Sequence, residues 1–299
     1  MFMARTRDII IGTIIAIIGL MFIMMVVISI WGISHQDGIS LASAGGRVAI
    51  VEITGVINGS EDIIRQLKKY EKDNSIKAVV IRINSPGGEV APTQEIYDQI
   101  NKLKESGKPV VVSISSVAAS GGYYIACAGD TIFANPGSLT GSIGVIIDFL
   151  TFEGLMNKVG VQHEVVKSGE LKDVGNFSRP MTEKERTMMQ AAINDVYNQF
   201  TETISESRNI DLAQVEEMAD GSIFTGNQAL ELGLVDKLGG LEDAIVLAGK
   251  MGGLGDHPKT IREYYRRPRL VDYLTGELMN ALGLKATNSE GPSFKYIYR

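Results

Sequence analysis

The longest apolar stretch of the chain lies near its start. No residue in the range 9–33 is charged, and most are Ile, Met, Val or Leu. Because an α-helix rises 1.5 Å per residue, about 20 apolar residues suffice to cross the hydrocarbon core of a membrane. Arg5 and Arg7 precede the run, so the positive-inside rule places residues 1–8 in the cytoplasm. The pattern predicts a single-pass anchor over residues 9–33, with the rest of the chain on the extracytoplasmic side.

A cleaved secretory signal is the alternative interpretation of this stretch. Ala42-Ser43-Ala44 resembles a cleavage site. However, the apolar run is longer than the roughly 7–15 residues of a signal-peptide core, and the site lies well beyond its end. We therefore favour an uncleaved anchor, followed by a Gly/Ser-rich linker over residues 34–46.

Beyond residue 46, short β-branched runs alternate with amphipathic segments. This alternation predicts βαβ units, and hence an α/β fold with a mostly parallel sheet. Strands are expected at residues 47–53, 78–83, 110–115, 131–134, 144–148 and 162–166, and helices at residues 61–72 (with Ser60 as N-cap), 92–105, 119–128 and 152–159.

The second half of the chain has mainly helical periodicity. Within residues 181–208, apolar residues recur at intervals of four, which predicts a long amphipathic helix with this stripe in the core. The stripe consists of Met188, Ala192, Val196 and Phe200. Shorter helices are expected at residues 212–220, 227–234 and 241–251, with a short strand at residues 223–224.

The Gly-rich residues 252–255 mark the end of the compact domain, which is therefore expected to span residues 47–251. A basic and amphipathic C-terminal extension, residues 252–299, follows. Its stretch 270–284 could lie on an anionic membrane surface, dock on a neighbouring subunit or cover an edge of the core.

Composition narrows the classes of function. The chain is 44% hydrophobic and 21% charged, with a net charge of −6. That balance argues against nucleic-acid binding, since such binding needs a basic face. The single cysteine, Cys127, cannot form an intramolecular disulfide and is expected to be a small buried residue. No Cys/His spacing indicates zinc, and no Gly-rich loop carries the lysine of a nucleotide site, so we expect neither a metal nor a cofactor.

Two short segments carry the candidate chemistry. Residues 84–88, Asn-Ser-Pro-Gly-Gly, and residues 118–122, Ala-Ala-Ser-Gly-Gly, each follow a predicted strand. The first offers backbone N–H groups with no side chain in the way. The second places Ser120 at a strand-to-helix turn. A serine beside bare amides is the minimum for acyl transfer, because it supplies a nucleophile and a hole for the oxyanion.

The base that would activate this serine is not expected to be a histidine. The chain has only three histidines. His35 is at the membrane edge, His163 begins a predicted strand and His257 lies in the predicted boundary region.

Four motifs occur in a specific order along the chain. They are residues 84–88, residues 118–124, the run Leu139-Thr140-Gly141-Ser142-Ile143-Gly144-Val145 and the run Lys167-Ser168-Gly169-Glu170-Leu171-Lys172-Asp173. Together they resemble the short form of signal peptide peptidase A (protease IV), from about Arg47 to Met251. The resemblance implies the ClpP/crotonase superfold, with repeated ββα units and a mostly parallel sheet, preceded by one transmembrane helix.

The resemblance implies roles for five residues. Ser120 matches the nucleophile, Lys172 the general base and Ser142 the serine that orients the lysine amine. The amides of Gly88 and Gly121 match the oxyanion hole.

A lysine can take the proton of a serine only when it is neutral. Its pKa, ordinarily near 10.4, must therefore fall by several units, and burial has that effect. Glu170 and Asp173 would stabilise the charged form if they faced the amine, so we expect both to point elsewhere. Lys167 is the rival base, and the motif favours Lys172.

The resemblance further implies a membrane-anchored serine endopeptidase that degrades remnant signal peptides and related apolar peptides. It implies a homo-oligomer in which nucleophile and base can come from neighbouring subunits. Two alternatives stay open. One is another membrane-anchored Ser-Lys peptidase of the same superfold, acting on membrane-protein segments. The other is a non-catalytic scaffold that keeps the fold but has lost hydrolysis.

Overall fold

The computed structural model describes residues 19–20, 24, 46–263 and 295–297. The chain divides into two units, Met1–Ala44 and Gly45–Arg299, and each is considered by itself. In the first unit, residues 19–20 and 24 are helical, and the rest of the predicted anchor lies outside the described residues. None of the helices formed by the described residues is both long enough and apolar enough to cross a membrane.

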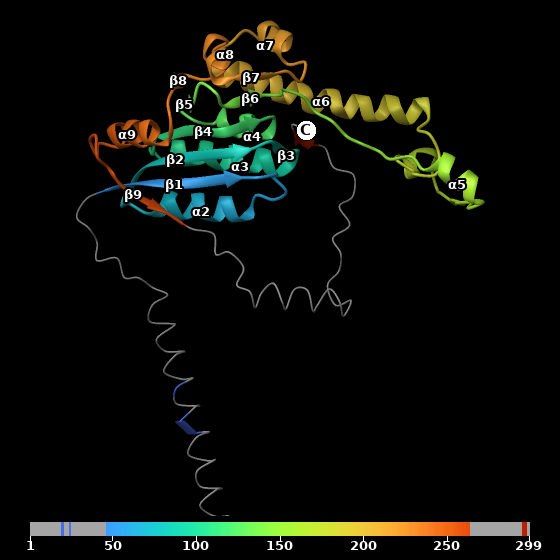
Figure 1. Cartoon of the computed structure of the whole chain (residues 1–299), viewed down its shortest axis with the longest axis horizontal. Coiled ribbons are helices and arrows are strands. Elements are labelled where there is room, and N and C mark those ends of the chain that lie inside the picture. Colours follow the sequence, from blue (N-terminus) through green and yellow to red (C-terminus); the bar gives the residue numbers. More distant parts are fainter. Residues whose placement is uncertain (1–18, 21–23, 25–45, 264–294, 298–299) are drawn as a thin grey trace, which may run out of the picture. The chain divides into compact units, whose positions relative to one another are not determined.

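Eight strands of the described part of the second unit form one sheet. They are β1 (Arg47–Thr54), β2 (Ile76–Ser85), β4 (Val110–Ala119), β5 (Thr131–Ala134), β6 (Leu139–Gly141), β7 (Ile223–Thr225), β8 (Lys237–Leu238) and β9 (Lys259–Arg262). The order is β7-β6-β4-β2-β1-β9, and β5 pairs with both β4 and β8 (Figure 1). Every pairing is parallel except that of β6 with β7, so the predicted mostly parallel α/β sheet is confirmed.

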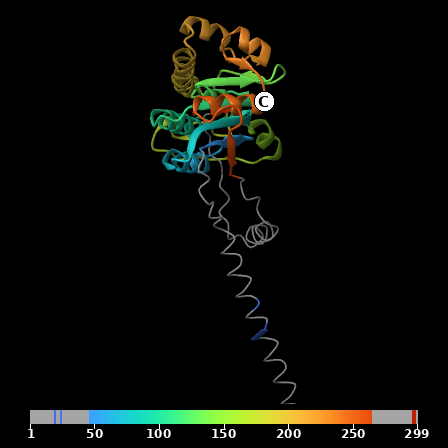
Figure 2. The ribbon, with the colours of Figure 1, turned by 90° about the vertical axis from the view of Figure 1, so that its left-hand side faces the viewer.

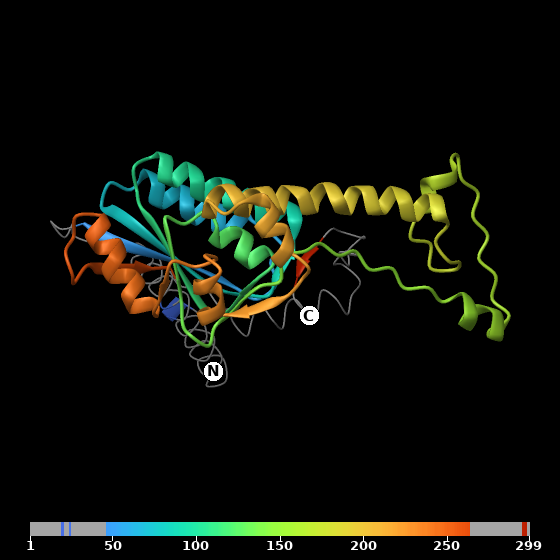
Figure 3. The same cartoon turned by 90° about the horizontal axis from the view of Figure 1, so that it is seen from above.

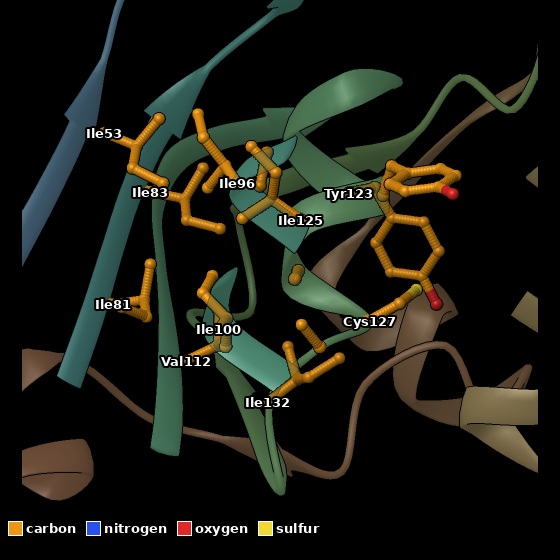
Figure 4. Packing of buried hydrophobic residues seen from close by; sticks show 14 of the residues in the cluster. Ile53, Ile81, Ile83, Ile96, Ile100, Val112, Tyr123, Ile125, Cys127 and Ile132 are labelled. Atoms are coloured by element: carbon orange, nitrogen blue, oxygen red, sulfur yellow. The ribbon is translucent and has the colours of Figure 1, made fainter. Parts of the chain in front are cut away.

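The central strands are apolar on both sides because both faces of the sheet are covered. In β2, Val79, Ile81 and Ile83 belong to the core on one face, whereas Ala78 and Val80 belong to the core on the other. This double burial explains the uninterrupted β-branched runs of the sequence, which are typical of parallel strands. Figure 4 shows the larger of the two cores.

Helices supply the cover on each face. The first core receives apolar side chains from α2 (Glu61–Lys72), α3 (Val90–Glu105) and α4 (Gly121–Ala126), and the second from α9 (Leu241–Met251) (Figure 2). Ser60 occupies the predicted N-cap position of α2, but its hydroxyl donates to Glu95 and does not cap the helix. Two further short helices, α7 (Leu212–Met218) and α8 (Gly226–Glu231), follow later in the chain.

The long predicted helix exists as α6 (Glu183–Arg208), but only its C-terminal half enters the core. Phe200 is fully buried, whereas Met188 is 36% exposed. The expectation that the whole apolar stripe is buried is therefore wrong for the N-terminal half, which extends beyond the sheet (Figure 3). Two short elements precede it, α5 (Glu153–Val159) and the 3₁₀ helix η1 (Glu170–Asp173), and neither buries a residue. We call residues 146–188 the arm.

Two predicted strands are wrong. Residues 144–148 contain only an isolated bridge position, because the chain leaves the sheet at the end of β6. Residues 162–166 form neither strand nor helix, and Val166 is 97% exposed. An alternating or β-branched pattern makes a strand only where a neighbouring strand is available to pair with it, and residues 162–166 pair with no strand among the described residues.

Several short strands were not predicted. β6 has three residues and β8 two, which is too short for a periodic pattern to show. β9 pairs parallel with β1. The sheet thus continues into residues that the Gly-rich boundary at 252–255 had assigned to the extension. The amphipathic stretch 270–284 lies outside the described residues.

Packing of the helical layer gives a direct test of the fold. Leu103 of α3 is fully buried, and Leu103→Ala should lower the free energy of unfolding by about 2–5 kcal/mol, because it removes apolar contacts and leaves a cavity. Leu230→Ala is the matched control: Leu230 is 37% exposed, and its truncation should cost less than about 1 kcal/mol. Urea unfolding of the full chain measures both. Equal losses would contradict the arrangement of α3 on the sheet.

Candidate active site

The ends of β2 and β4 bring the two Gly-containing segments together. Ser85, at the end of β2, pairs with Ala118 near the end of β4. Both chains leave the sheet at the same edge, as parallel strands do. The turn at residues 86–88 therefore lies beside the turn at Ser120, although 32 residues separate Gly88 from Ser120 in sequence (120 − 88).

Ser120 sits in a strained backbone conformation between β4 and α4. Its φ is 52° and its ψ is −117°, a combination that residues other than glycine rarely adopt. Two backbone hydrogen bonds hold it: Ser120 N–H donates to the Gly141 carbonyl (2.8 Å), and the Ser120 carbonyl accepts from Tyr124 N–H (2.9 Å). Such a conformation costs on the order of 1–3 kcal/mol and persists only where the surroundings impose it. This is the sharp turn that the sequence predicted for a nucleophile.

The surroundings of this turn are rigid. The first turn of α4 packs so closely that a Cβ at Gly122 would lie 2.9 Å from the Ser85 carbonyl oxygen. Tyr123 and Ile125 are fully buried, and the Tyr123 hydroxyl donates to the Leu234 carbonyl (2.8 Å) (Figure 4). Gly121, the first residue of α4, is also buried. The side chain of Ser120 is itself only marginally exposed, and its Oγ lies 3.5 Å from the Gly144 carbonyl oxygen.

Gly88 lies in a three-residue strand, β3 (Gly87–Glu89), whose backbone is fixed on one side by Ile57. Ile57 N–H donates to the Gly87 carbonyl (2.9 Å), and Glu89 N–H donates to the Ile57 carbonyl (2.7 Å). Because successive peptide groups of a strand face opposite sides, the N–H of Gly88 faces away from Ile57. A Cβ at Gly88 would lie only 2.1 Å from the Ile57 carbonyl oxygen, so glycine is required here by close approach.

On the side away from Ile57, β3 pairs with a second strand, β10 (Lys295–Ile297). The pairing is antiparallel and places Tyr296 opposite Gly88. The edge at Gly88 thus accepts an extended peptide segment by main-chain pairing. This contact could not be predicted, because the last residues of the chain have no clear pattern of apolar and polar positions.

Ser142 lies directly after Gly141, the residue that accepts the hydrogen bond from Ser120 N–H. Its φ is 49°, and its N–H donates to the Ser222 carbonyl (2.7 Å). Ser142 is 8% exposed, and its hydroxyl has no hydrogen-bond partner among the described residues. The structure therefore brings Ser142 into the same small region as Ser120 and Gly88.

Lys172 is elsewhere. It lies on η1 in the arm with its side chain exposed, and its Nζ makes no hydrogen bond or ion pair within the described residues. Figures 1 and 3 show α5, its neighbour in the arm, at the far end of α6 from α4. Within one copy of the chain, Lys172 Nζ therefore makes no hydrogen bond to Ser120.

The carboxylates next to Lys172 are paired with other cations. Glu170 bonds Lys184 (2.5 Å), and Asp173 bonds Lys167 (2.5 Å) and Arg179 (2.9 Å). The expectation that both acids point away from the Lys172 amine agrees with these contacts. The rival base, Lys167, is held by its ion pair with Asp173 and by the Glu170 carbonyl (2.8 Å).

Two other side chains that could take part in chemistry, Cys127 and His163, pack against neighbouring residues. Cys127 is buried, and burial raises the pKa of its thiol to about 11, so it stays protonated, as expected for a small core residue. His163 lies in the arm, where its Nδ1 is 3.1 Å from the Ser178 hydroxyl and its ring packs against Phe177. The prediction that His163 begins a strand is wrong.

A cavity of about 530 Å³ lies beyond β1 and is lined by residues that include Ile53, Val56, Ile57 and Ile96. Neither Ser120 nor Gly88 lines it. It touches the site only through Ile57, the residue paired with β3.

Comparison with known proteins shows the family of the chain. Residues 102–254 match the model of peptidase family S49, and residues 39–139 match that of Clp protease. The chain belongs to peptidase family S49. These matched ranges contain Ser120, Ser142, Lys172 and the Gly87-Gly88 turn.

Relatives of this S49 peptidase cover most of its length. A candidate signal peptide peptidase SppA of Enterococcus faecium is 38% identical over 77% of the chain and 67% of the relative. A candidate protease of Synechocystis sp. is 44% identical over 77% of the chain and 83% of the relative. Protease 4 of Haemophilus influenzae is 37% identical over 67% of the chain, but the chain covers only 34% of that longer protein.

The close approach of Gly88 to Ile57 predicts the effect of one methyl group. Gly88→Ala should lower casein cleavage by at least about 100-fold, because β3 must move away from Ile57 and carry its amides with it. Gly137→Ala is the control, since a Cβ there meets no atom within 4 Å, and its activity should match the unaltered protein. Casein cleavage by both full-length variants is the measurement. An active Gly88→Ala variant would contradict the fixed geometry of β3.

Proposed function

We propose that this S49 peptidase is a membrane-anchored serine endopeptidase that uses a Ser-Lys dyad. Ser120 is the nucleophile, Lys172 the general base and Ser142 the residue that orients the lysine amine. The observation that carries the proposal is the strained Ser120 turn next to the Gly88 strand, in a chain of this family. A nucleophile on a tight turn beside backbone N–H groups is the arrangement that acyl transfer requires.

The reaction follows from these groups. Neutral Lys172 Nζ takes the Ser120 hydroxyl proton as Oγ bonds to the scissile carbonyl carbon, and the carbonyl electrons move to its oxygen. The Gly88 and Gly121 N–H groups donate to that oxyanion. Collapse breaks the C–N bond, and the proton on Nζ passes to the leaving amine. Water then attacks the acyl-enzyme, gives a proton to Nζ and releases the acid, and the proton returns to Oγ.

The base is supplied by a neighbouring copy of the chain in this proposal. Lys172 is carried on the arm, which lies away from its own Ser120. The Ser142 hydroxyl, beside Ser120, has no partner among the described residues. The arm also exposes apolar side chains that a second copy would cover: Leu150 is 74% exposed, Leu155 59% and Val159 64%. Placing Lys172 of one copy at Ser142 of the next would complete the site and desolvate the amine together.

Extended apolar peptides are the substrate class that fits. The edge of β3 pairs with an extended strand, which is how a peptide can present its main chain to the Gly88 amide. The candidate signal peptide peptidase relative and the apolar run at residues 9–33 support remnant signal peptides as substrates, reached from the extracytoplasmic face of the membrane.

Single substitutions test the assignment of nucleophile and base. Ser120→Ala and Lys172→Ala should each abolish casein cleavage and labelling by a fluorophosphonate probe, while the fold is kept. Lys167→Ala, the matched lysine control, should remain active. An inactive Lys167→Ala with an active Lys172→Ala would refute the base assignment. An unaltered protein that neither cleaves casein nor takes the probe would favour a scaffold without hydrolysis.

Mixed oligomers extend this test to the origin of the base. Co-expressed Ser120→Ala and Lys172→Ala chains should recover about a quarter of the full activity, because a site then needs Ser120 from one type of copy and Lys172 from the other. If both groups came from one chain, the mixture would stay inactive. Activity per assembled particle is the measurement, with each single variant as the control.

The strand β10 predicts the effect of shortening the chain. Deleting residues 293–299 should raise the rate of peptide cleavage severalfold, because a substrate no longer competes with β10 for the edge of β3. The steady-state rate with a fluorogenic apolar peptide checks this result. A fall in the rate would mean that these residues complete the site.

A further inference from the structure

The charged side chains near Lys172 in the sequence form ion pairs with one another, and none of these pairs includes Lys172. Within the described part of the arm and the start of α6, every acid of this group is bonded to a cation of the group. The members are Lys167, Glu170, Asp173, Arg179, Lys184 and Glu185.

Arg179 is the fixed centre of the network. Its Nη1 and Nη2 donate to the two carboxylate oxygens of Glu185 at 2.8 and 2.6 Å, a bidentate pair. The Glu185 side chain is only 1% exposed and belongs to the capping box of α6, where it also accepts from Thr182 N–H (2.8 Å). The pair with Arg179 lowers the pKa of Glu185 to about 2, so Glu185 stays charged. Arg179 is thus anchored to the rigid first turn of a long helix.

From this anchor, Arg179 reaches back to the residue after Lys172. Its Nη2 donates to Asp173 Oδ1 at 2.9 Å. Lys167 Nζ donates to the same oxygen, and Asn176 donates to Oδ2 (3.1 Å). Lys167, Asn176 and Arg179 hold the pKa of Asp173 well below its usual range, so it remains an anion turned toward its donors. Lys167 lies on an irregular segment, whereas Arg179 is tied to α6, so Arg179 is the member that sets the direction of Asp173.

We propose that Arg179 is a positioning residue for the reaction: it holds the Asp173 carboxylate away from the Lys172 amine and so keeps that amine free to accept the Ser120 proton. The inference rests on the proposed role of Lys172. Asp173 directly follows Lys172 and is the nearest anion along the chain. Released from Arg179, it could pair with the ammonium form of Lys172 and stabilise it. A lysine held as ammonium cannot act as a base.

Loss of Arg179 should slow the reaction at low pH, because the released Asp173 carboxylate would stabilise the ammonium form of Lys172. An opposite charge within about 4–6 Å raises the pKa of a lysine by about 1–3 units, and partial exposure favours the low end. The rate needs the neutral amine, so the rising limb of the pH profile should move to higher pH. At a pH below the rising limb, a shift of the limb to higher pH by one unit lowers the rate about tenfold.

The test is the pH dependence of fluorophosphonate labelling by the full-length chain. The unaltered protein sets the reference position of the rising limb. In Arg179→Gln it should move up by about one unit, with labelling about tenfold slower below the limb and similar rates above it. Arg179→Lys keeps a cation but loses the bidentate fork, so its limb should lie between the two. The double variant Arg179→Gln/Asp173→Asn should return the limb to its original position, because the released carboxylate is gone.

Other outcomes would overturn the proposal. Arg186→Gln is the matched control, since Arg186 is an exposed arginine in the first turn of α6 with no ion pair within the described residues, and its profile should be unchanged. Equal slowing of Arg179→Gln at every pH would show a merely structural role. A double variant that keeps the shifted limb would exclude Asp173 as the cause. Arg179→Lys carries the test if Arg179→Gln does not fold. Normal labelling of Lys172→Ala, by contrast, would refute the proposed base whatever Arg179 does.

Discussion

The positive φ of Ser120 is the constraint on which the rest of the site depends. A serine does not keep this conformation by itself, so neighbouring strands must impose it. The hydrogen bond from Ser120 N–H to Gly141 fixes the turn to β6, and the burial of α4 fixes its other side. The same pairing of β4 with β6 delivers Ser142, and the pairing of β4 with β2 delivers Gly88. One edge of one sheet therefore sets the positions of three candidate groups.

The sequence predicted this edge well because its signals are local. The β-branched runs of β1, β2 and β4 are buried on both faces, and each of them appears in the structure close to its expected bounds. The Gly-Gly pairs after β2 and β4 mark the two turns in the sequence, although the contacts that require glycine at Gly88 and Gly122, with Ile57 and Ser85, appear only in the fold. Since parallel strands end at one edge, the adjacency of Gly88 and Ser120 followed from their positions after two such strands.

The arm was predicted poorly because local sequence signals do not show which surfaces meet in the fold. Val166 was interpreted as part of a strand, but it is 97% exposed, and no other described element of this copy packs over it. Periodicity indicates that a surface is apolar without showing what covers it. The strand β10 was missed because three residues of main-chain pairing leave no pattern of side chains. The directions of Glu170 and Asp173 could be inferred from the chemistry of a neutral amine, but their partners, Lys184 and Arg179, could not.

The length of α6 has a consequence of its own. Its 26 residues correspond to about 39 Å of rigid rod, with Phe200 buried in the core in its C-terminal third and Thr182 capping its N-terminus. Substitutions along its exposed middle leave the reach of this rod unchanged. Removing a single residue there would shorten it by only about 1.5 Å but swing everything beyond the gap by about 100° around the helix axis. Along this span the protein is therefore tolerant of changed residues and intolerant of a changed residue number.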